Sequence, residues 1–178
     1  MVLIGFGLIG MNVVDMARVT WRDVRNGYLS YERAKTHRKY KIRIEPEVME
    51  LIERHRGEEH LMAWADRYHD YKSFNQHLNE EGLQRIGPWE WKEVADSYHT
   101  RRVKVWHPLM PDVTYYMLRH TWACMAAELD IPKDIIALCL GHGKRTVTDV
   151  YVRYDQRKID DANRKVLDYA FGLLRSKQ

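Results

Sequence analysis

The sequence predicts an α+β domain that is mostly helical and carries one small antiparallel β-sheet. Apolar residues recur at helical spacing over much of the chain, most clearly in its last third. Two segments rich in aromatic and branched residues, 28–34 and 39–44, flank a polar turn at 36–38 and indicate a β-hairpin. The 178 residues suffice for one domain with a sizeable core.

The first elements are predicted from helix-start and turn signals. Asn12 can cap a helix, Asp15 suits its positive end, and the turn dipeptide Asn26-Gly27 follows. This pattern predicts a helix from Asn12 to about Val24. After the hairpin, Pro46 opens a further helix with apolar residues at 48, 49, 51 and 52.

The second half is predicted to be mainly helical. Ser73 and Gln76 resemble a capping box for a helix that continues to about residue 86. The tryptophan-rich stretch 87–113 is expected to form a helix followed by a loop or strand. Helices are then expected at 115–129, at 132–140 between Pro132 and Gly141, and from 146 onward. An apolar stripe makes the C-terminal segment 156–178 an amphipathic helix.

The charge distribution is compatible with a polyanionic partner. The chain has 29 Lys and Arg against 25 acids, a net charge of +4. No acid occurs between Arg33 and Arg43. This run is either a solvated hairpin edge kept charged against aggregation or a nucleic-acid-binding face, and the residues alone do not separate the two.

Other features argue against metal, disulfide and membrane classes. The two cysteines, Cys124 and Cys139, lie among apolar residues without metal-ligand spacing, as expected of thiols in a reducing cytosol. The uncharged run of residues 1–14 is too short to span a bilayer and lacks a basic leading region. We therefore expect a cytoplasmic protein with neither a bound metal nor a membrane partner.

Three motifs in the last third stand out together. They are Leu118-Arg119-His120-Thr121, Leu140-Gly141-His142, and Tyr151 nine residues after that histidine. Each alone has a commoner explanation: a surface arginine, a helix-ending glycine, and a core tyrosine with its hydroxyl at the surface.

In combination these motifs resemble the signature of the tyrosine recombinases, or phage integrases. The run Gly7-Leu8-Ile9-Gly10-Met11-Asn12 to Asp15 resembles the opening box of that family, and Ala34-Lys35-Thr36 resembles its β-hairpin lysine. The similarity extends from Gly7 to Tyr154. It implies a recombinase-like catalytic domain that performs site-specific DNA recombination or integration in a bacterium or its mobile element.

The resemblance also implies a role for each motif residue. Tyr151 would attack the DNA backbone and form a 3′-phosphotyrosine intermediate, with Arg119 and His142 binding the non-bridging oxygens. Lys35 would be the general acid, and Tyr116 would assist where the family usually has histidine. The intermediate keeps the bond energy, so no cofactor is expected. Double-stranded DNA is the expected partner, with homo-oligomers forming on it, and the expected DNA-contacting side chains are Arg33, His37, Arg38, Lys39 and His120.

Two features depart from the family pattern. Asn12 stands where the first arginine is usual, although some members lack it, and we hypothesise that Arg18 or Arg22 on the same predicted helix reaches the phosphate instead. Only eleven residues precede Asn12, so we expect residues 1–178 to be a single catalytic domain without the N-terminal DNA-clamping domain. Weak, salt-sensitive DNA binding would follow. The C-terminal helix is expected to pack on its own core, with docking on a neighbouring protomer as the alternative.

Other functions remain open at this point. The chain could be a catalytically inactive, DNA-binding relic of a recombinase, and Tyr154 is a reserve nucleophile. A type IB topoisomerase would use similar chemistry, but the compact length and the LGH motif favour a recombinase. Gly5-Phe6-Gly7-Leu8-Ile9-Gly10 is a literal GxGxxG, and Glu32 could bind a ribose, as in an NAD-binding Rossmann enzyme. This alternative is disfavoured because no further βαβ units are visible.

Overall fold

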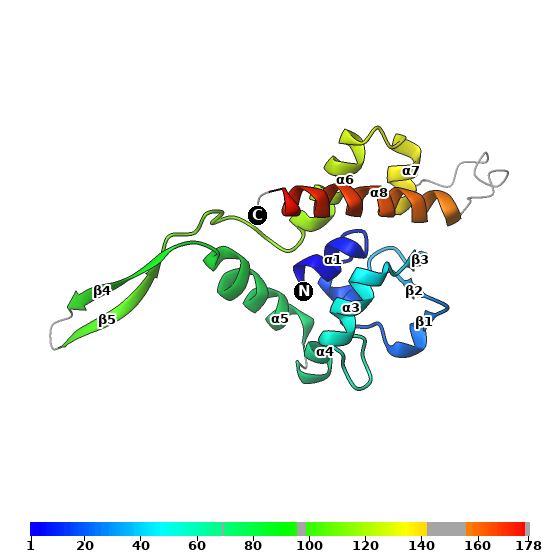
Figure 1. Ribbon diagram of the computed structural model, residues 1–178. Coiled ribbons are helices and arrows are strands. Elements are labelled where there is room, and N and C mark those ends of the chain that lie inside the picture. Colours follow the sequence, from blue (N-terminus) through cyan, green and yellow to red (C-terminus); the bar gives the residue numbers. More distant parts are fainter. Residues whose placement is uncertain (69, 96–98, 142–155, 177–178) are drawn as a thin grey trace. The chain divides into compact units, whose positions relative to one another are not determined.

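The computed structural model describes residues 1–68, 70–95, 99–141 and 156–176, and its class is α+β. Helices predominate, and two small antiparallel sheets complete the fold (Figure 1). The chain divides into two compact units, Met1–Tyr71 with Tyr116–Gln178, and Lys72–Tyr115, where the sequence predicted one domain. None of the helices in this described part is long and apolar enough to cross a membrane.

The first unit begins with two short helices, α1 (Val2–Gly7) and α2 (Val13–Met16). The prediction of one helix from Asn12 to Val24 is wrong in length. Asn12 is the N-cap by backbone conformation, but its side chain makes no capping hydrogen bond. The helix stops because the backbone of Thr20 pairs with His60, and a capping box between Thr20 and Asp23 starts a separate 3-10 turn.

The structure does not provide the context that a dinucleotide-binding GxGxxG motif requires. That motif must follow a β-strand of a parallel sheet. Here residues 2–7 form α1, and every strand pair among the described residues is antiparallel. The literal glycine pattern is therefore part of a buried helix and the turn after it.

The predicted hairpin is confirmed. Strands β1 (Val24–Arg25), β2 (Tyr28–Glu32) and β3 (Lys39–Arg43) form an antiparallel sheet in that order. Leu29 pairs with Ile42, and both are buried. Helix α3 (Pro46–Arg54) starts at the predicted proline, and the short helix α4 (Ala63–Arg67) follows.

The helices of the last third close the core of the first unit. They are α6 (Met117–Glu128), α7 (Lys133–Cys139) and α8 (Gln156–Arg175). Figure 1 shows α8 running beside α6 and α7, and it also contacts β3. Its apolar stripe buries Val166 and Leu167 completely. The C-terminal helix therefore packs on its own chain, as expected.

Polar anchors fix α8 to this core. Trp122 donates from its indole Nε1 to Asn163 Oδ1 at 2.9 Å, and Asn163 Nδ2 donates to the Gly7 carbonyl oxygen at 2.9 Å. Arg164 Nη1 forms ion pairs with Glu45 Oε2 at 3.2 Å and with Glu47 Oε1 at 2.6 Å. These contacts join α8 to α6, α1 and the start of α3.

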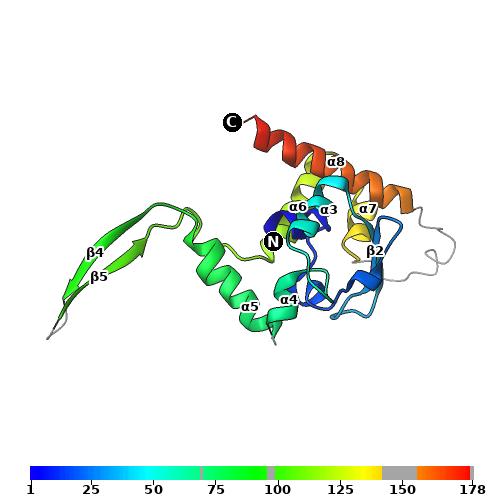
Figure 2. The same cartoon turned by 60° about the horizontal axis from the view of Figure 1, so that its bottom comes forward.

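The second unit contains a helix and a long two-stranded ribbon. Helix α5 (Tyr71–His77) continues through a π-helical turn (Leu78–Gly82) and a 3-10 turn (Leu83–Arg85). It starts two residues before the predicted capping box. Strands β4 (Trp89–Ala95) and β5 (Thr100–Trp106) then form the ribbon seen in Figure 2. The helix expected near residue 89 is wrong, because aromatic and branched residues pair across the strands, beginning with Trp89 opposite Trp106.

Candidate active site

The buried carboxylate of Asp15 ties the opening box to the β2–β3 hairpin. Asp15 Oδ1 accepts a hydrogen bond from the backbone N–H of Ala34 at 2.7 Å. Arg33 Nε lies 4.0 Å from Asp15 Oδ2. Burial raises the pKa of Asp15, and the Ala34 hydrogen bond and the charges of Arg33, Arg119 and Arg18 oppose this shift. The hydrogen bond to Asp15 therefore fixes the backbone of Ala34, the residue before Lys35.

Arg33, one of the residues expected to contact DNA, is buried. Only 6% of it is exposed, because its side chain turns inward toward Asp15. The charged run from Arg33 to Arg43 is thus not uniformly a solvated edge. Its first member compensates a buried acid.

Arg119 on α6 is also buried, with 6% of its surface exposed. Its Nη1 lies 3.5 Å from the carbonyl oxygens of Ile9 and Gly10, and its Nη2 donates to the carbonyl oxygen of Leu140. Among the described side chains, its Nε is one of the few buried polar atoms without a hydrogen-bond partner. The guanidinium therefore bridges the opening box and the LGH motif, and the simple interpretation as a surface arginine is wrong.

A close backbone approach makes this bridge possible. Gly10 has φ of +61°, and a Cβ there would lie 2.3 Å from the Cα of Arg119. Neither the left-handed conformation nor the available space suits a side chain. The last glycine of the opening box is therefore required by packing against α6.

The end of α7 is the second partner of the hairpin. Tyr40 Oη donates to the Leu140 carbonyl oxygen at 2.9 Å, and Arg38 Nη1 donates to the Gly141 carbonyl oxygen at 3.1 Å. Gly141 has φ of +62°, as predicted for a helix-ending glycine, and a Cβ there would lie 1.6 Å from Tyr40 Oη. Tyr31 stacks on Tyr40 with ring centroids 5.3 Å apart. Hairpin and helix end thus form one packed corner.

The remaining described site residues face solvent. Lys35 and Lys39 are exposed on the hairpin, and Tyr116 is 60% exposed at the start of α6. The exposed His37 has φ of +53°, and its Nδ1 lies 2.9 Å from Glu32 Oε1. The Nε2 of the exposed His120 lies 3.6 Å from Cys124 Sγ. These positions leave the predicted DNA contacts Lys39, His37 and His120 accessible, whereas Arg38 already donates to Gly141.

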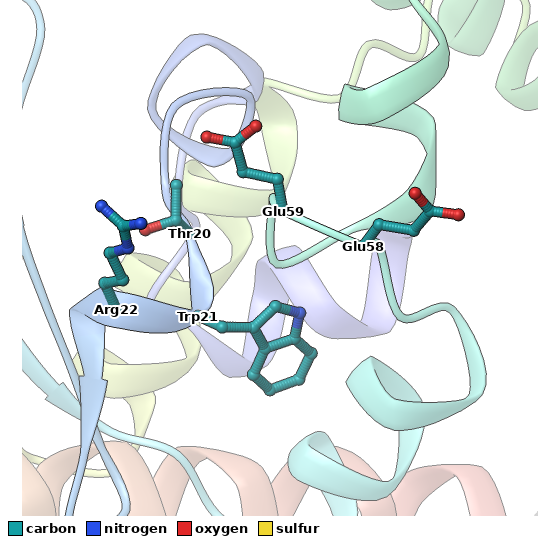
Figure 3. A pocket seen from close by; sticks show the side chains of 5 residues that line it. All are labelled: Thr20, Trp21, Arg22, Glu58 and Glu59. Carbon is teal, nitrogen blue, oxygen red and sulfur yellow. The ribbon is translucent and has the colours of Figure 1, made fainter.

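The two cations proposed to replace the missing arginine do not share a helix. Arg18 follows α2, and Arg22 lies in the separate 3-10 turn (Trp21–Asp23). Arg22 borders a hollow of about 370 Å³ together with Thr20, Trp21, Glu58 and Glu59 (Figure 3). The two acids that line the same hollow, Glu58 and Glu59, disfavour a phosphate there. Arg18 is exposed and acts electrostatically on Asp15, so it is the better candidate.

Three predicted residues, His142, Tyr151 and the reserve Tyr154, lie outside the described residues. Within the described ranges, no group of three or more His, Cys, Asp or Glu is arranged to hold a metal ion.

Sequence reasoning missed the roles of Asp15 and Tyr40. Asp15 fits a helix start, so its local pattern gives no sign of burial. Tyr40 alternates with Lys39 and Lys41 along β3, and this period-2 pattern is the signal that could have placed its ring on the packed face.

Comparison with known proteins finds no relative. No family model matches the chain, and neither a curated protein nor a solved structure is significantly similar to it. The functional argument therefore depends on the residues and on the geometry described above.

Proposed function

We propose that this chain is the catalytic domain of a site-specific DNA recombinase or integrase, which cuts and rejoins DNA strands through a phosphotyrosine link to Tyr151. It acts on double-stranded DNA and requires neither a metal nor another cofactor. The motif resemblance supplies the residue types, and the packed corner supplies the geometric support.

One observation carries the proposal. The carbonyl oxygen of Leu140 accepts hydrogen bonds from both Arg119 on α6 and Tyr40 on β3. The hairpin that carries the motif lysine, α6 and the end of α7 therefore meet at one backbone group, with Tyr40 100 positions and Arg119 21 positions before Leu140.

We propose different roles for the two motif cations Lys35 and Arg119. Lys35 lies in the exposed turn that Asp15 anchors, where a flexible ammonium can reach the leaving oxygen of bound DNA and donate a proton. Arg119 presents a planar set of donors that suits two phosphate oxygens. Both of its terminal nitrogens contact backbone carbonyls, whereas its Nε has no hydrogen-bond partner among the described residues, so the Nε–H is the donor left for a phosphate oxygen.

Trapping the covalent intermediate tests this function. The chain is incubated with a nicked suicide duplex, whose cleaved fragment diffuses away, and the products are separated in denaturant. We expect a protein–DNA adduct that is lost in Tyr151→Phe and kept in the matched variant Tyr154→Phe. An adduct lost only in Tyr154→Phe would identify Tyr154 as the nucleophile. Relaxation of supercoiled plasmid without sequence preference would favour a topoisomerase.

A catalytically inactive DNA-binding relic is the second candidate. It is favoured by Asn12 in place of the first arginine and by the engagement of Arg119 with protein carbonyls. The relic binds duplex DNA but forms no adduct on any nicked substrate. In that case Arg119→Ala lowers stability without affecting a covalent step.

A further inference from the structure

The β4–β5 ribbon sorts its side chains onto two different faces. In the antiparallel register Trp89 pairs with Trp106, Trp91 with Lys104, and Glu93 with Arg102. Because side chains alternate along a strand, these residues share one face, called here the tryptophan face. The opposite face carries Glu90, Lys92, Val94, Arg101, Val103 and Val105.

The tryptophan face is unusually open for an aromatic cluster. Trp89 is 44% exposed and Trp91 is 52% exposed. Their rings meet edge to face with centroids 6.0 Å apart, and Trp106 lies 6.1 Å from Trp89. Large aromatic side chains gathered on a surface mark a binding site more often than they serve a monomer.

Cations lie over these rings. Lys104 Nζ is 3.9 Å from the ring centroid of Trp89 and 5.4 Å from that of Trp106, and Arg102 lies 5.7 Å from the ring centroid of Trp91. Indole rings offer flat surfaces for stacking, and the neighbouring cations can reach a phosphate attached to a stacked group. Glu93 is the one acid on this face, so its net charge is positive.

We infer that the tryptophan face of the β4–β5 ribbon binds single-stranded nucleic acid, whose bases stack on the indoles while Arg102 and Lys104 contact its phosphates. Duplex DNA hides its base faces inside the stack, so only an unpaired strand can use this combination. A membrane surface fits less well, because charged residues interrupt the apolar area along both strands. This inference concerns the second unit and does not depend on strand transfer at Tyr151.

The two faces give the experiment its matched controls, because each carries two cations and one acid. The full chain is titrated with a fluorescein-labelled oligothymidylate of about 20 nucleotides, and anisotropy is measured. We expect Trp91→Leu to weaken binding about tenfold and Trp91→Phe, which keeps an aromatic ring, to weaken it much less. Lys104→Ala and Arg102→Ala should each weaken binding several-fold, whereas Lys92→Ala and Arg101→Ala should change it less than about twofold.

Several outcomes would overturn this inference. Equal losses in the Lys92 and Lys104 variants would indicate non-specific charge attraction, and unchanged binding by Trp91→Leu would exclude stacking. Loss of duplex binding in Trp91→Leu as large as its loss of oligothymidylate binding, or a tryptophan emission shift with anionic vesicles but not with oligothymidylate, would assign the face to another partner. An oligouridylate arm distinguishes RNA from DNA. Far-ultraviolet circular dichroism confirms that each variant is folded.

The result can be separated from the proposed function. Tyr151→Phe should bind oligothymidylate like the unmodified chain, because the ribbon does not use that residue. If Trp91→Leu did not weaken oligothymidylate binding but the covalent adduct still formed, the recombinase proposal would stand without this inference. If Trp91→Leu weakened oligothymidylate binding but no covalent adduct formed, this inference would stand without the recombinase proposal.

Discussion

The carboxylate of Asp15 accepts a hydrogen bond from the backbone N–H of Ala34 at 2.7 Å, across nineteen residues of sequence. Asp15 belongs to the opening box, and Ala34 directly precedes the proposed general acid Lys35. The hydrogen bond satisfies the backbone N–H of Ala34 at the start of the turn. The same carboxylate lies beside the guanidinium of Arg33. It therefore sets the position of the hairpin relative to α2.

Replacing Asp15 should separate its hydrogen-bonding role from its charge. Asp15→Asn keeps an acceptor for the Ala34 N–H, whereas Asp15→Ala leaves that donor without its partner at a cost of about 1–3 kcal/mol. We expect Asp15→Ala to be the less stable variant in urea unfolding. Equal losses of stability in Asp15→Asn and Asp15→Ala would mean that the charge near Arg33 and Arg119, which both variants lack, outweighs the hydrogen bond.

The pH dependence of stability should report the burial of Asp15. Burial raises its folded-state pKa above the ordinary value of 3.8, so the folded chain holds that proton more tightly than the unfolded chain. The stabilisation from this group is complete below pH 3.8 and is lost as pH rises through the folded-state pKa. The stability advantage of the unmodified chain over Asp15→Asn should therefore shrink from acid to neutral pH. An advantage that grows over this range would show that Arg33 and Arg119 dominate.

Gly141→Ala should disrupt the corner between α7 and the hairpin. Its Cβ would lie 1.6 Å from Tyr40 Oη, and its φ of +62° is unfavourable for alanine. We expect a loss of more than about 2 kcal/mol in urea unfolding. The control Tyr40→Phe removes one hydrogen bond and should cost only about 1 kcal/mol. Similar losses in both variants would contradict the close contact.

Asn163→Ala should loosen α8 from the core. It removes the acceptor of the buried Trp122 Nε1 and the donor to the Gly7 carbonyl, and each unsatisfied group costs about 1–3 kcal/mol. Thermal unfolding should shift clearly downward, whereas Lys165→Ala, exposed on the same helix, should change stability by less than about 0.5 kcal/mol. Equal behaviour of the two variants would argue against docking of α8 on its own chain.

The two cysteines should differ sharply in reactivity. Cys124 is exposed on α6, whereas Cys139 is buried on α7 and burial raises the pKa of its thiol to about 12. Since the thiolate is the reacting form, iodoacetamide should modify Cys124 in the folded chain and Cys139 only in denaturant. Mass spectrometry of the alkylated protein measures this. Rapid native modification of Cys139 would mean that α7 leaves the corner readily.

Which local elements form was largely determined by the sequence alone. Pro46 starts α3, Gly141 ends the helix before it, the β2–β3 hairpin has its expected turn, and the stripe on α8 faces the core. These features depend on the conformational preferences of single residues and on hydrophobic periodicity, which act within a few positions. The extent of the helix after Asn12 and the strand β4 were mispredicted, because pairing partners elsewhere in the chain decided them.

Only the tertiary structure decided which polar groups are buried together. Arg33 and Arg119 look like surface cations in the sequence, yet both side chains turn inward. Arg33 lies beside the carboxylate of Asp15. Arg119 contacts the backbone carbonyl oxygens of Ile9, Gly10 and Leu140. The cost of burying a charge is met by partners up to 110 residues away in sequence. No local pattern records such a pairing, since it exists only once the hairpin, α6 and the end of α7 have packed around a common corner.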